Sequence, residues 1–148
     1  MKINFQVHES YQIAGLDAFS EYLKNWLTGL DYHIIELNYR LTCDEEVRRA
    51  NAKFLNHDYY TDIITFDNCV GNRLQADILV SLDRVMENAD DLGAESGNEL
   101  LRVMIHGVLH LLGHGDGTQL EKKQMRALED DVMKLFHVEH SSLRLSNV

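Results

Sequence analysis

The sequence has few cysteines and no long hydrophobic run, and each shortage excludes a class of protein. Cys43 and Cys69 lie far apart and form no C-x-x-C pair, so we expect reduced thiols rather than a disulfide framework. No apolar stretch is long enough to cross a bilayer, and the first residues lack the pattern of a secretory signal. We therefore expect a cytoplasmic protein without a membrane partner.

Basic residues are also scarce. The chain has 14 Lys and Arg against 24 Asp and Glu, a formal net charge of −10. Proteins that coat nucleic acids use clustered Lys and Arg, so this balance argues against a broad nucleic-acid-binding surface. A local site is still compatible with it, because a divalent ion and a small basic rim attract phosphate even on an acidic protein. The positive groups available for such a rim are Arg48, Arg49, Lys53, Arg73, Lys122, Lys123 and Arg126.

The rest of the composition is ordinary for a globular protein, with 45% hydrophobic and 26% charged residues among 148. We expect one domain over residues 1–148, of the α+β class, with a small mixed sheet of about four strands packed against helices. Alternating or β-branched runs predict strands at 2–8, 33–42, 61–66 and 74–80, the last two antiparallel. Helical periodicity predicts helices at 16–30, 44–55, 81–92, 96–112 and 118–137.

Local signals refine the ends of these elements. Asp44 is expected to be the N-cap of its helix, because its carboxylate can accept hydrogen bonds from the first turn. Ser96 followed by Glu99 has the spacing of a capping box. The residues after His140 are expected to be loose.

The segment ELLRVMIHGVLHLLGHGD, from Glu99 to Asp116, organises the chain. It is apolar around most of the helical circumference, which is typical of a helix in the middle of a fold. His106 and His110 are four residues apart, so they point in the same direction from this helix. Gly113 can take the left-handed conformation that ends a helix, and Asp116 can then return to the histidine face.

The pattern H-x-x-x-H-x-x-G-x-x-D therefore predicts a metal site made of His106, His110 and Asp116. These three ligands leave the fourth tetrahedral position open for a water, which is how catalytic zinc sites differ from structural ones. We expect one zinc ion, and the ligands also suit nickel or cobalt. His114 is a competing third ligand, but its flanking glycines take it off the helical face. No side chain stands out as the general base; Glu99 is expected to support a ligand or cap the helix.

A resemblance to a known family starts at this motif. The run from His106 to Gly113 is similar to the H-G-x-L-H-L-x-G signature of the YbeY family of bacterial metal-dependent endoribonucleases. Other family elements are matched in the same order, over roughly residues 45 to 130: Leu55-Asn56, T-D-I-I-T-F at 61–66, A-D-I at 76–78, and M-x-x-x-E from Met125 to Glu129. The resemblance implies a zinc-dependent, single-strand-specific endoribonuclease that matures the 3′ end of small-subunit ribosomal RNA and acts in ribosome quality control. Its implied partners are this RNA precursor and the ribosome or ribosomal proteins.

The chain departs from the family pattern at two places. The family motif ends G-Y-D-H, so Asp116 stands where the family has a third histidine; a carboxylate is still a competent zinc ligand. Many members carry an arginine soon after the Leu-Asn pair, where this chain has H-D-Y-Y at 57–60. Arg73 or Arg102 is a candidate substitute, and His57 stands where it can approach a substrate.

Two other functions stay open on the sequence. One is a metal-dependent hydrolase of a non-RNA substrate such as peptide, but a peptidase of the H-E-x-x-H type needs a glutamate where this chain has Gly107. The other is a ribosome-associated binding factor with a structural metal, whose Asp116 variant would still bind ribosomes.

Overall fold

The computed structural model describes residues 1–148 as five helices and six strands. The strands are β1 (Lys2–Val7), β2 (Tyr11–Ala14), β3 (His33–Thr42), β4 (Ile63–Asp67), β5 (Arg73–Ser81) and β6 (Arg144–Asn147). The helices are α1 (Leu16–Gly29), α2 (Asp44–Leu55), α3 (Leu82–Leu92), α4 (Ser96–Leu111) and α5 (Gln119–Glu139). The expected α+β class is confirmed, and the four predicted strands correspond to β1, β3, β4 and β5.

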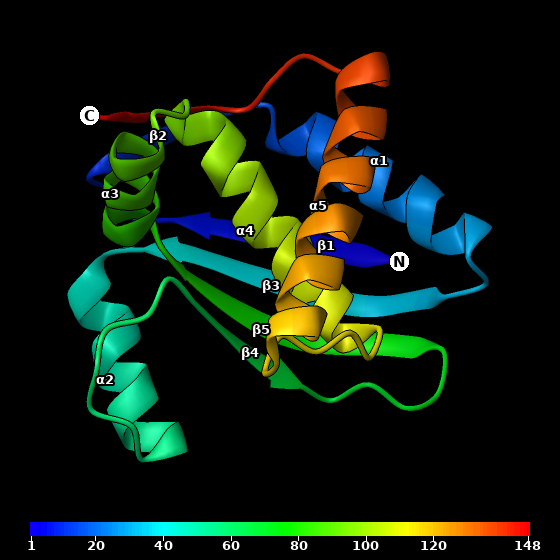
Figure 1. Cartoon of the computed structure of the whole chain (residues 1–148), viewed down its shortest axis with the longest axis horizontal. Helices are drawn as coiled ribbons and strands as arrows, with labels where there is room; N and C mark the ends of the chain where they lie inside the picture. The colour runs from blue at the N-terminus through cyan, green and yellow to red at the C-terminus, as the bar shows by residue number, and fades with distance from the viewer.

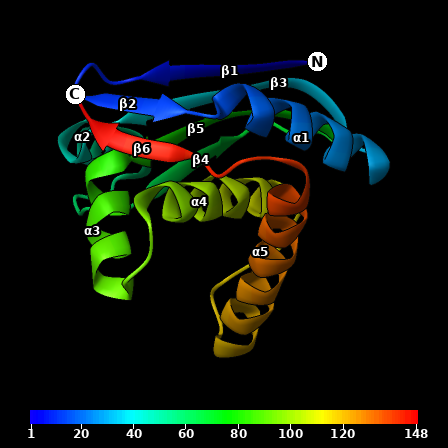
Figure 2. The same cartoon turned by 90° about the horizontal axis from the view of Figure 1, so that it is seen from above.

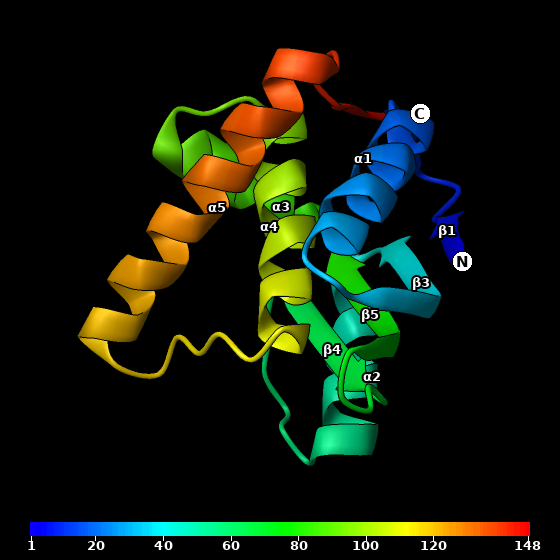
Figure 3. The ribbon, with the colours of Figure 1, turned by 90° about the vertical axis from the view of Figure 1, so that its right-hand side faces the viewer.

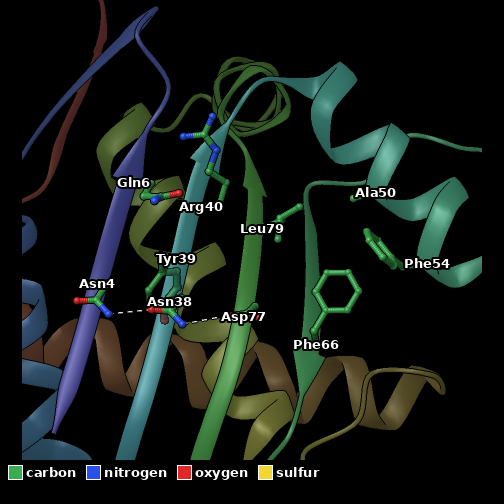
Figure 4. Close-up of a pocket in the computed structure, with 10 residues that line it drawn as sticks. All are labelled: Asn4, Gln6, Asn38, Tyr39, Arg40, Ala50, Phe54, Phe66, Asp77 and Leu79. Atoms are coloured by element: carbon green, nitrogen blue, oxygen red, sulfur yellow. Dashed lines mark hydrogen bonds between the residues drawn. The ribbon is translucent and has the colours of Figure 1, made fainter.

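The main sheet is mixed, with the strand order β1-β3-β5-β4. β1 pairs with β3 and β3 with β5 in parallel, whereas β4 runs antiparallel to β5, as predicted for that pair. Alternation along the strands separates the two faces of the sheet. One face is apolar and buried, with Leu37, Leu41 and Ile78 fully covered. The other face carries a polar row across β1, β3 and β5 (Figure 4).

All helices except α2 lie on the apolar face of this sheet (Figure 2). Figure 2 shows α4 next to the sheet and α5 beyond it, while α2 lies at the opposite side, near β4 and β5 (Figures 1 and 3). α4 lies this close because Gly107 has no side chain: a Cβ there would be 2.8 Å from Cδ1 of Ile63. The sheet covers one side of α4 and α5 packs against another, as the apolar sequence of α4 requires, while His106 and His110 stay partly exposed. None of the five helices has the length and apolar character of a membrane span.

The end of the chain differs from our expectation. The residues after His140 are not loose, because β6 pairs antiparallel with β2 in a separate two-stranded sheet. Leu143 and Leu145 are buried there. The carbonyl oxygen of Leu143 lies so near the first turn of α4 that a Cβ on Gly97 would be 1.8 Å away. The C-terminal strand therefore holds the start of α4 in place.

Two of the predicted helix caps are wrong. Cys43, not Asp44, is the N-cap of α2, since Asp44 already has helical geometry and accepts from Ser81 and Arg84 instead. Glu95 is the N-cap of α4, and no capping box forms because Ser96 Oγ donates to the carbonyl of Leu145, 3.0 Å away. In both cases the side chain expected to cap its own helix hydrogen-bonds instead to a residue that is distant in sequence.

Candidate metal centre

His106, His110 and Asp116 converge at the C-terminal end of α4. The two histidine Nε2 atoms are 2.9 Å apart, and Asp116 Oδ2 lies 3.3 Å from the first and 3.4 Å from the second. Ligands about 2.0 to 2.1 Å from one tetrahedral zinc ion are separated by about 3.3 Å, so these spacings suit a single shared ion. The structure thus brings the three predicted residues together in a geometry that fits zinc.

The turn after α4 brings Asp116 to the histidines. Gly113 has a φ of 97°, which is the left-handed conformation expected from the sequence. Its N–H donates to the carbonyl of His110, and the N–H of His114 donates to that of Leu109, at 3.0 and 3.1 Å. His114 is exposed and lies outside the group of possible ligands. The geometry therefore favours Asp116 over His114 as the third ligand.

A buried carboxylate on α5 orients the first histidine. Glu129 is 4% exposed, and its Oε2 lies 2.6 Å from Nδ1 of His106. Because an ionised carboxylate only accepts, Nδ1 is the donor, and Nε2 presents its lone pair to the cluster. Arg102 holds Glu129 from the other side, with Nη1 3.0 Å from Oε1. Metal-binding histidines commonly have this kind of carboxylate partner.

This role of Glu129 was missed in the sequence. The M-x-x-x-E element was recognised, but nothing in it indicates which residue the glutamate contacts. Glu99, which we expected to support a ligand or cap the helix, does neither, although it is 6% exposed and lines the same hollow as His106. Only the packing of α5 on α4 distinguishes the two glutamates.

Burial sets the electrostatics around the cluster. It raises the pKa of both Asp62 and Glu99, because a carboxylate loses hydration in the interior. Burial opposes the charged form of His106 as well, but its hydrogen bond to Glu129 and the nearby carboxylates outweigh that effect and raise the pKa of His106. The surroundings of the cluster are thus negative, which favours a cation at the convergence point.

Two hollows meet at the cluster, and His106, Asp116 and Asp62 line both. The first, which we call the cationic hollow, has a volume of about 270 Å³ and is also lined by Lys122 and Arg126. The second, the aromatic hollow, has a volume of about 300 Å³ and is also lined by His57 and Tyr59. The suggestion that His57 stands near the candidate site is therefore supported by its position.

Neither arginine suggested as a substitute is free for that role. Arg73 lies at the start of β5 and lines neither hollow. Arg102 lines the cationic hollow, but its guanidinium donates to Glu129 and to Asp130, 2.7 Å away. These two carboxylates neutralise the charge of Arg102. The cations that remain available to a phosphate in this hollow are Lys122 and Arg126 on the exposed side of α5.

A larger hollow of about 690 Å³ lies on the polar face of the sheet, away from the cluster. Figure 4 shows its polar row, in which Asn4 donates to Asn38 and Asn38 donates to Asp77, at 2.8 and 3.0 Å. Phe54 of α2 meets Phe66 edge to face at its other end. It contains neither histidine nor cysteine, so it offers no comparable metal-binding group.

The fold and the cluster together define an α+β protein with a His-His-Asp geometry suited to a metal ion. A family model described as Endoribonuclease YbeY matches residues 4–137. The chain belongs to the YbeY family, which confirms the resemblance seen in the sequence.

Individual relatives agree with this assignment. The chain is 38% identical to a protein of Flavobacterium johnsoniae named Endoribonuclease YbeY, over 93% of this chain and 99% of that protein. It is 46% identical to a protein of the same name from Cytophaga hutchinsonii, over 76% and 82% of the two chains. The solution structure of a Thermotoga maritima protein is similar in fold, with a TM-score of 0.62 and 23% identity over 95% of this chain and 97% of that one.

Proposed function

We propose that this chain is a zinc-dependent endoribonuclease that cleaves single-stranded RNA, and that its substrate is the 3′ end of the small-subunit ribosomal RNA precursor. Family membership and the name shared by its relatives support the reaction class. The observation that carries the proposal is the convergence of His106, His110 and Asp116, with Glu129 fixing His106. Two nitrogens and one oxygen at tetrahedral spacing leave room for a substrate atom.

The residues present have distinct tasks in this proposal. His106, His110 and Asp116 would hold the ion, and Glu129 would keep His106 in the tautomer that ligation needs. A bound divalent ion supplies Lewis acidity that polarises a phosphoryl oxygen and makes nearby water more acidic. Asp62 lines both hollows beside the cluster, so it is positioned to accept a hydrogen bond from a molecule bound where the two hollows meet.

The structure gives a physical reason to disfavour a peptidase. The residue after the first histidine of an H-E-x-x-H peptidase must direct a carboxylate toward the ion. Here that residue is Gly107, whose Cα faces the sheet beside Ile63, Thr65 and Ile78. A glutamate at this position would be driven into the core and not into the cluster.

Cleavage of an RNA with an unprocessed small-subunit 3′ end tests the proposal. We expect zinc-loaded wild type to cut this RNA. The cleavage rate of Asp116→Ala should fall by more than the roughly 10- to 100-fold that is typical when a hydrogen-bond partner of a metal ligand is changed. His114→Ala is the matched control, since it removes the competing histidine and should keep full activity. Products are resolved on a sequencing gel.

Each contrary result has a separate meaning. Equal cleavage by wild type and Asp116→Ala would exclude Asp116 as a required ligand. Loss of cleavage only in His114→Ala would assign the third ligand to that histidine. If no protein cuts this RNA but wild type and Asp116→Ala both bind ribosomes, the chain is a binding factor; if wild type hydrolyses peptides, it is a hydrolase of another substrate.

The wider biological role belongs to the same proposal. Maturation of ribosomal RNA and removal of defective ribosomes would place the protein in the cytoplasm, with ribosomes or ribosomal proteins as partners. We also propose that residues 1–148 act as one domain, because one hydrophobic cluster includes side chains from Tyr11 to Leu145. Co-sedimentation of the protein with small ribosomal subunits tests the association.

A further inference from the structure

The two hollows at the candidate metal centre differ in chemistry. The cationic hollow lies toward α5, and the aromatic hollow lies toward the segment between α2 and β4. Since His106 and Asp116 line both, a molecule bound at the cluster can extend into each of them. One side offers the cations Lys122 and Arg126 beside the carboxylates that also line it, and the other offers aromatic rings.

The aromatic hollow has a ring platform held in place by the backbone. His57 and Tyr59 stack with their ring centroids 5.2 Å apart and their planes 22° from parallel, and Tyr59 is 55% exposed. Asn51, which is 2% exposed, fixes both residues: its side chain donates to the carbonyl of Tyr59, and its carbonyl accepts from the N–H of His57, each at 3.1 Å. An exposed aromatic face is thus held beside the cluster.

The cationic hollow contains charges that the protein itself does not neutralise. Lys122 forms no ion pair, and Arg126 has only a distant one, with Nη1 3.9 Å from Oε1 of Glu129. That oxygen already accepts from Arg102 at 3.0 Å. Arg48, by contrast, is paired with Glu45 and Asp58 and lies outside the hollow. On a chain of net charge −10, the unpaired Lys122 and the weakly paired Arg126 give this hollow a local attraction for a phosphate.

We propose that the two hollows are consecutive subsites for one RNA strand: an unstacked base lies against the Tyr59 and His57 rings, and a neighbouring phosphate lies at Lys122 and Arg126. The proposal rests on the ribonuclease function proposed above and adds how the substrate is held. Stacking on an aromatic ring accepts any base, because every base has a π face, whereas a base inside a duplex cannot reach the platform. The arrangement therefore selects single strands without selecting sequence.

The base subsite is tested with single-stranded RNAs that lack one base at successive positions around the cut. For wild type, loss of the base that reaches the platform should raise KM about 5-fold or more, the lower end for aromatic stacking on one base. Tyr59→Ala should raise KM for the intact RNA by a similar factor and should no longer respond to the missing base. Tyr59→Phe keeps the ring and loses only the hydroxyl that lies 3.2 Å from Nδ1 of His57, so it should retain the KM penalty for the missing base.

Tyr60→Ala is the matched control for this arm. Tyr60 is similarly exposed, at 51%, but its ring faces Arg48 and Arg84 and lines neither hollow. It should leave KM unchanged. If Tyr59→Ala keeps the wild-type penalty for the missing base, or if Tyr60→Ala has the same effect as Tyr59→Ala, the base subsite is wrong.

The phosphate subsite is tested by charge removal. The double variant Lys122→Gln/Arg126→Gln should bind single-stranded RNA more weakly, and the slope of log K against log salt should become shallower by about 0.7 for each phosphate that is no longer neutralised. Lys123→Gln removes a neighbouring charge that lines neither hollow and should leave the slope unchanged. An unchanged slope in the double variant would overturn this subsite.

Binding and cleavage together separate this inference from the proposed function. If wild type cuts RNA and these variants bind and cut RNA like wild type, the two-subsite proposal is wrong and the ribonuclease function stands. If wild type binds RNA with the predicted dependence on Tyr59, Lys122 and Arg126 but does not cut it, the two-subsite proposal stands and the proposed reaction is wrong.

Discussion

Two places in this molecule gather three metal-binding side chains within 4.8 Å of one another, and they differ in what those side chains already bind. One is the cluster of His106, His110 and Asp116. The other, which we call the N-terminal group, consists of His8, Cys43 and Glu46 at the start of α2. Proximity alone does not distinguish them.

The hydrogen bonds of their side chains distinguish the two groups. In the N-terminal group, Nδ1 of His8 accepts from the N–H of Ser10, so the neutral ring carries its proton on Nε2 and has no free lone pair. Glu46 accepts from both Arg40 and Thr42. In the cluster, Nδ1–H of His106 donates a hydrogen bond to Glu129, so the lone pair of Nε2 faces the other two side chains. The neighbours of a ligand, as much as the ligand itself, decide whether a site can take an ion.

The largest expected effect is loss of bound metal when a cluster histidine is removed. His110→Ala should eliminate zinc retention, since two remaining ligands hold an ion poorly. His8→Ala, the equivalent change in the N-terminal group, should leave zinc retention unaltered. Metal content per chain after dialysis measures both, and retention by His110→Ala would reverse our assignment of the two groups.

Removing the partner of His106 should have the next largest effect. Glu129→Gln loses the carboxylate that fixes the tautomer, so zinc affinity should fall about 10- to 100-fold while the fold persists. Asp130→Asn is the matched control, because Asp130 also accepts from Arg102 but does not touch His106. Competition with a zinc chelator measures the affinities; equal affinities for Glu129→Gln and wild type would show that the orientation of His106 is unimportant.

Zinc should also stabilise the folded chain through the cluster. A ligand that binds only the native state at 100 times its Kd adds about 2.7 kcal/mol, which raises Tm by several degrees for a chain of this size. This increase should disappear in Asp116→Ala and persist in Cys43→Ser. Thermal unfolding with and without zinc measures it, and a zinc-dependent increase that is lost in Cys43→Ser would point to the N-terminal group instead.

The smallest effect concerns the N-terminal group, where Glu46 should stabilise the fold without metal. The hydrogen bond from Arg40 holds the pKa of Glu46 below its usual value, so its contribution is present above the unfolded pKa and is lost as pH falls through the folded one. Because Glu46 is 40% exposed, we expect at most about 1 kcal/mol. Denaturation of Glu46→Gln and wild type should differ at pH 7 and converge in acid; a constant difference would exclude this ion pair as the cause.

The comparison also shows which parts of the site the sequence can predict. The helical spacing of His106 and His110 and the left-handed Gly113 are local properties, so the convergence with Asp116 could be read directly. Glu129 belongs to another helix, and its contact with His106 depends on how α5 packs. The sequence shows that Lys122 and Arg126 are basic. Only the structure shows that Arg102 is already paired with two carboxylates, which leaves Lys122 and Arg126 as the cations available to a phosphate.

The same limit applies to the fold. Strands β1, β3, β4 and β5 follow from alternation that is visible within each segment. β2 and β6 are four residues each, too short to give a period, and each finds its partner at the opposite end of the chain. Ser96 was misassigned for the same reason, because the oxygen it binds belongs to Leu145.

The pairing of β2 with β6 has a consequence for the order in which the chain folds. Tyr11 pairs with Asn147, so the contact closes a loop of nearly the full chain length. Such contacts form late because a long loop must close first, and during synthesis this one waits until β6 itself has left the ribosome. Since the segment before β6 also seats the first turn of α4 at Gly97, the nascent protein would complete its candidate centre only after β6 has been made and has paired with β2.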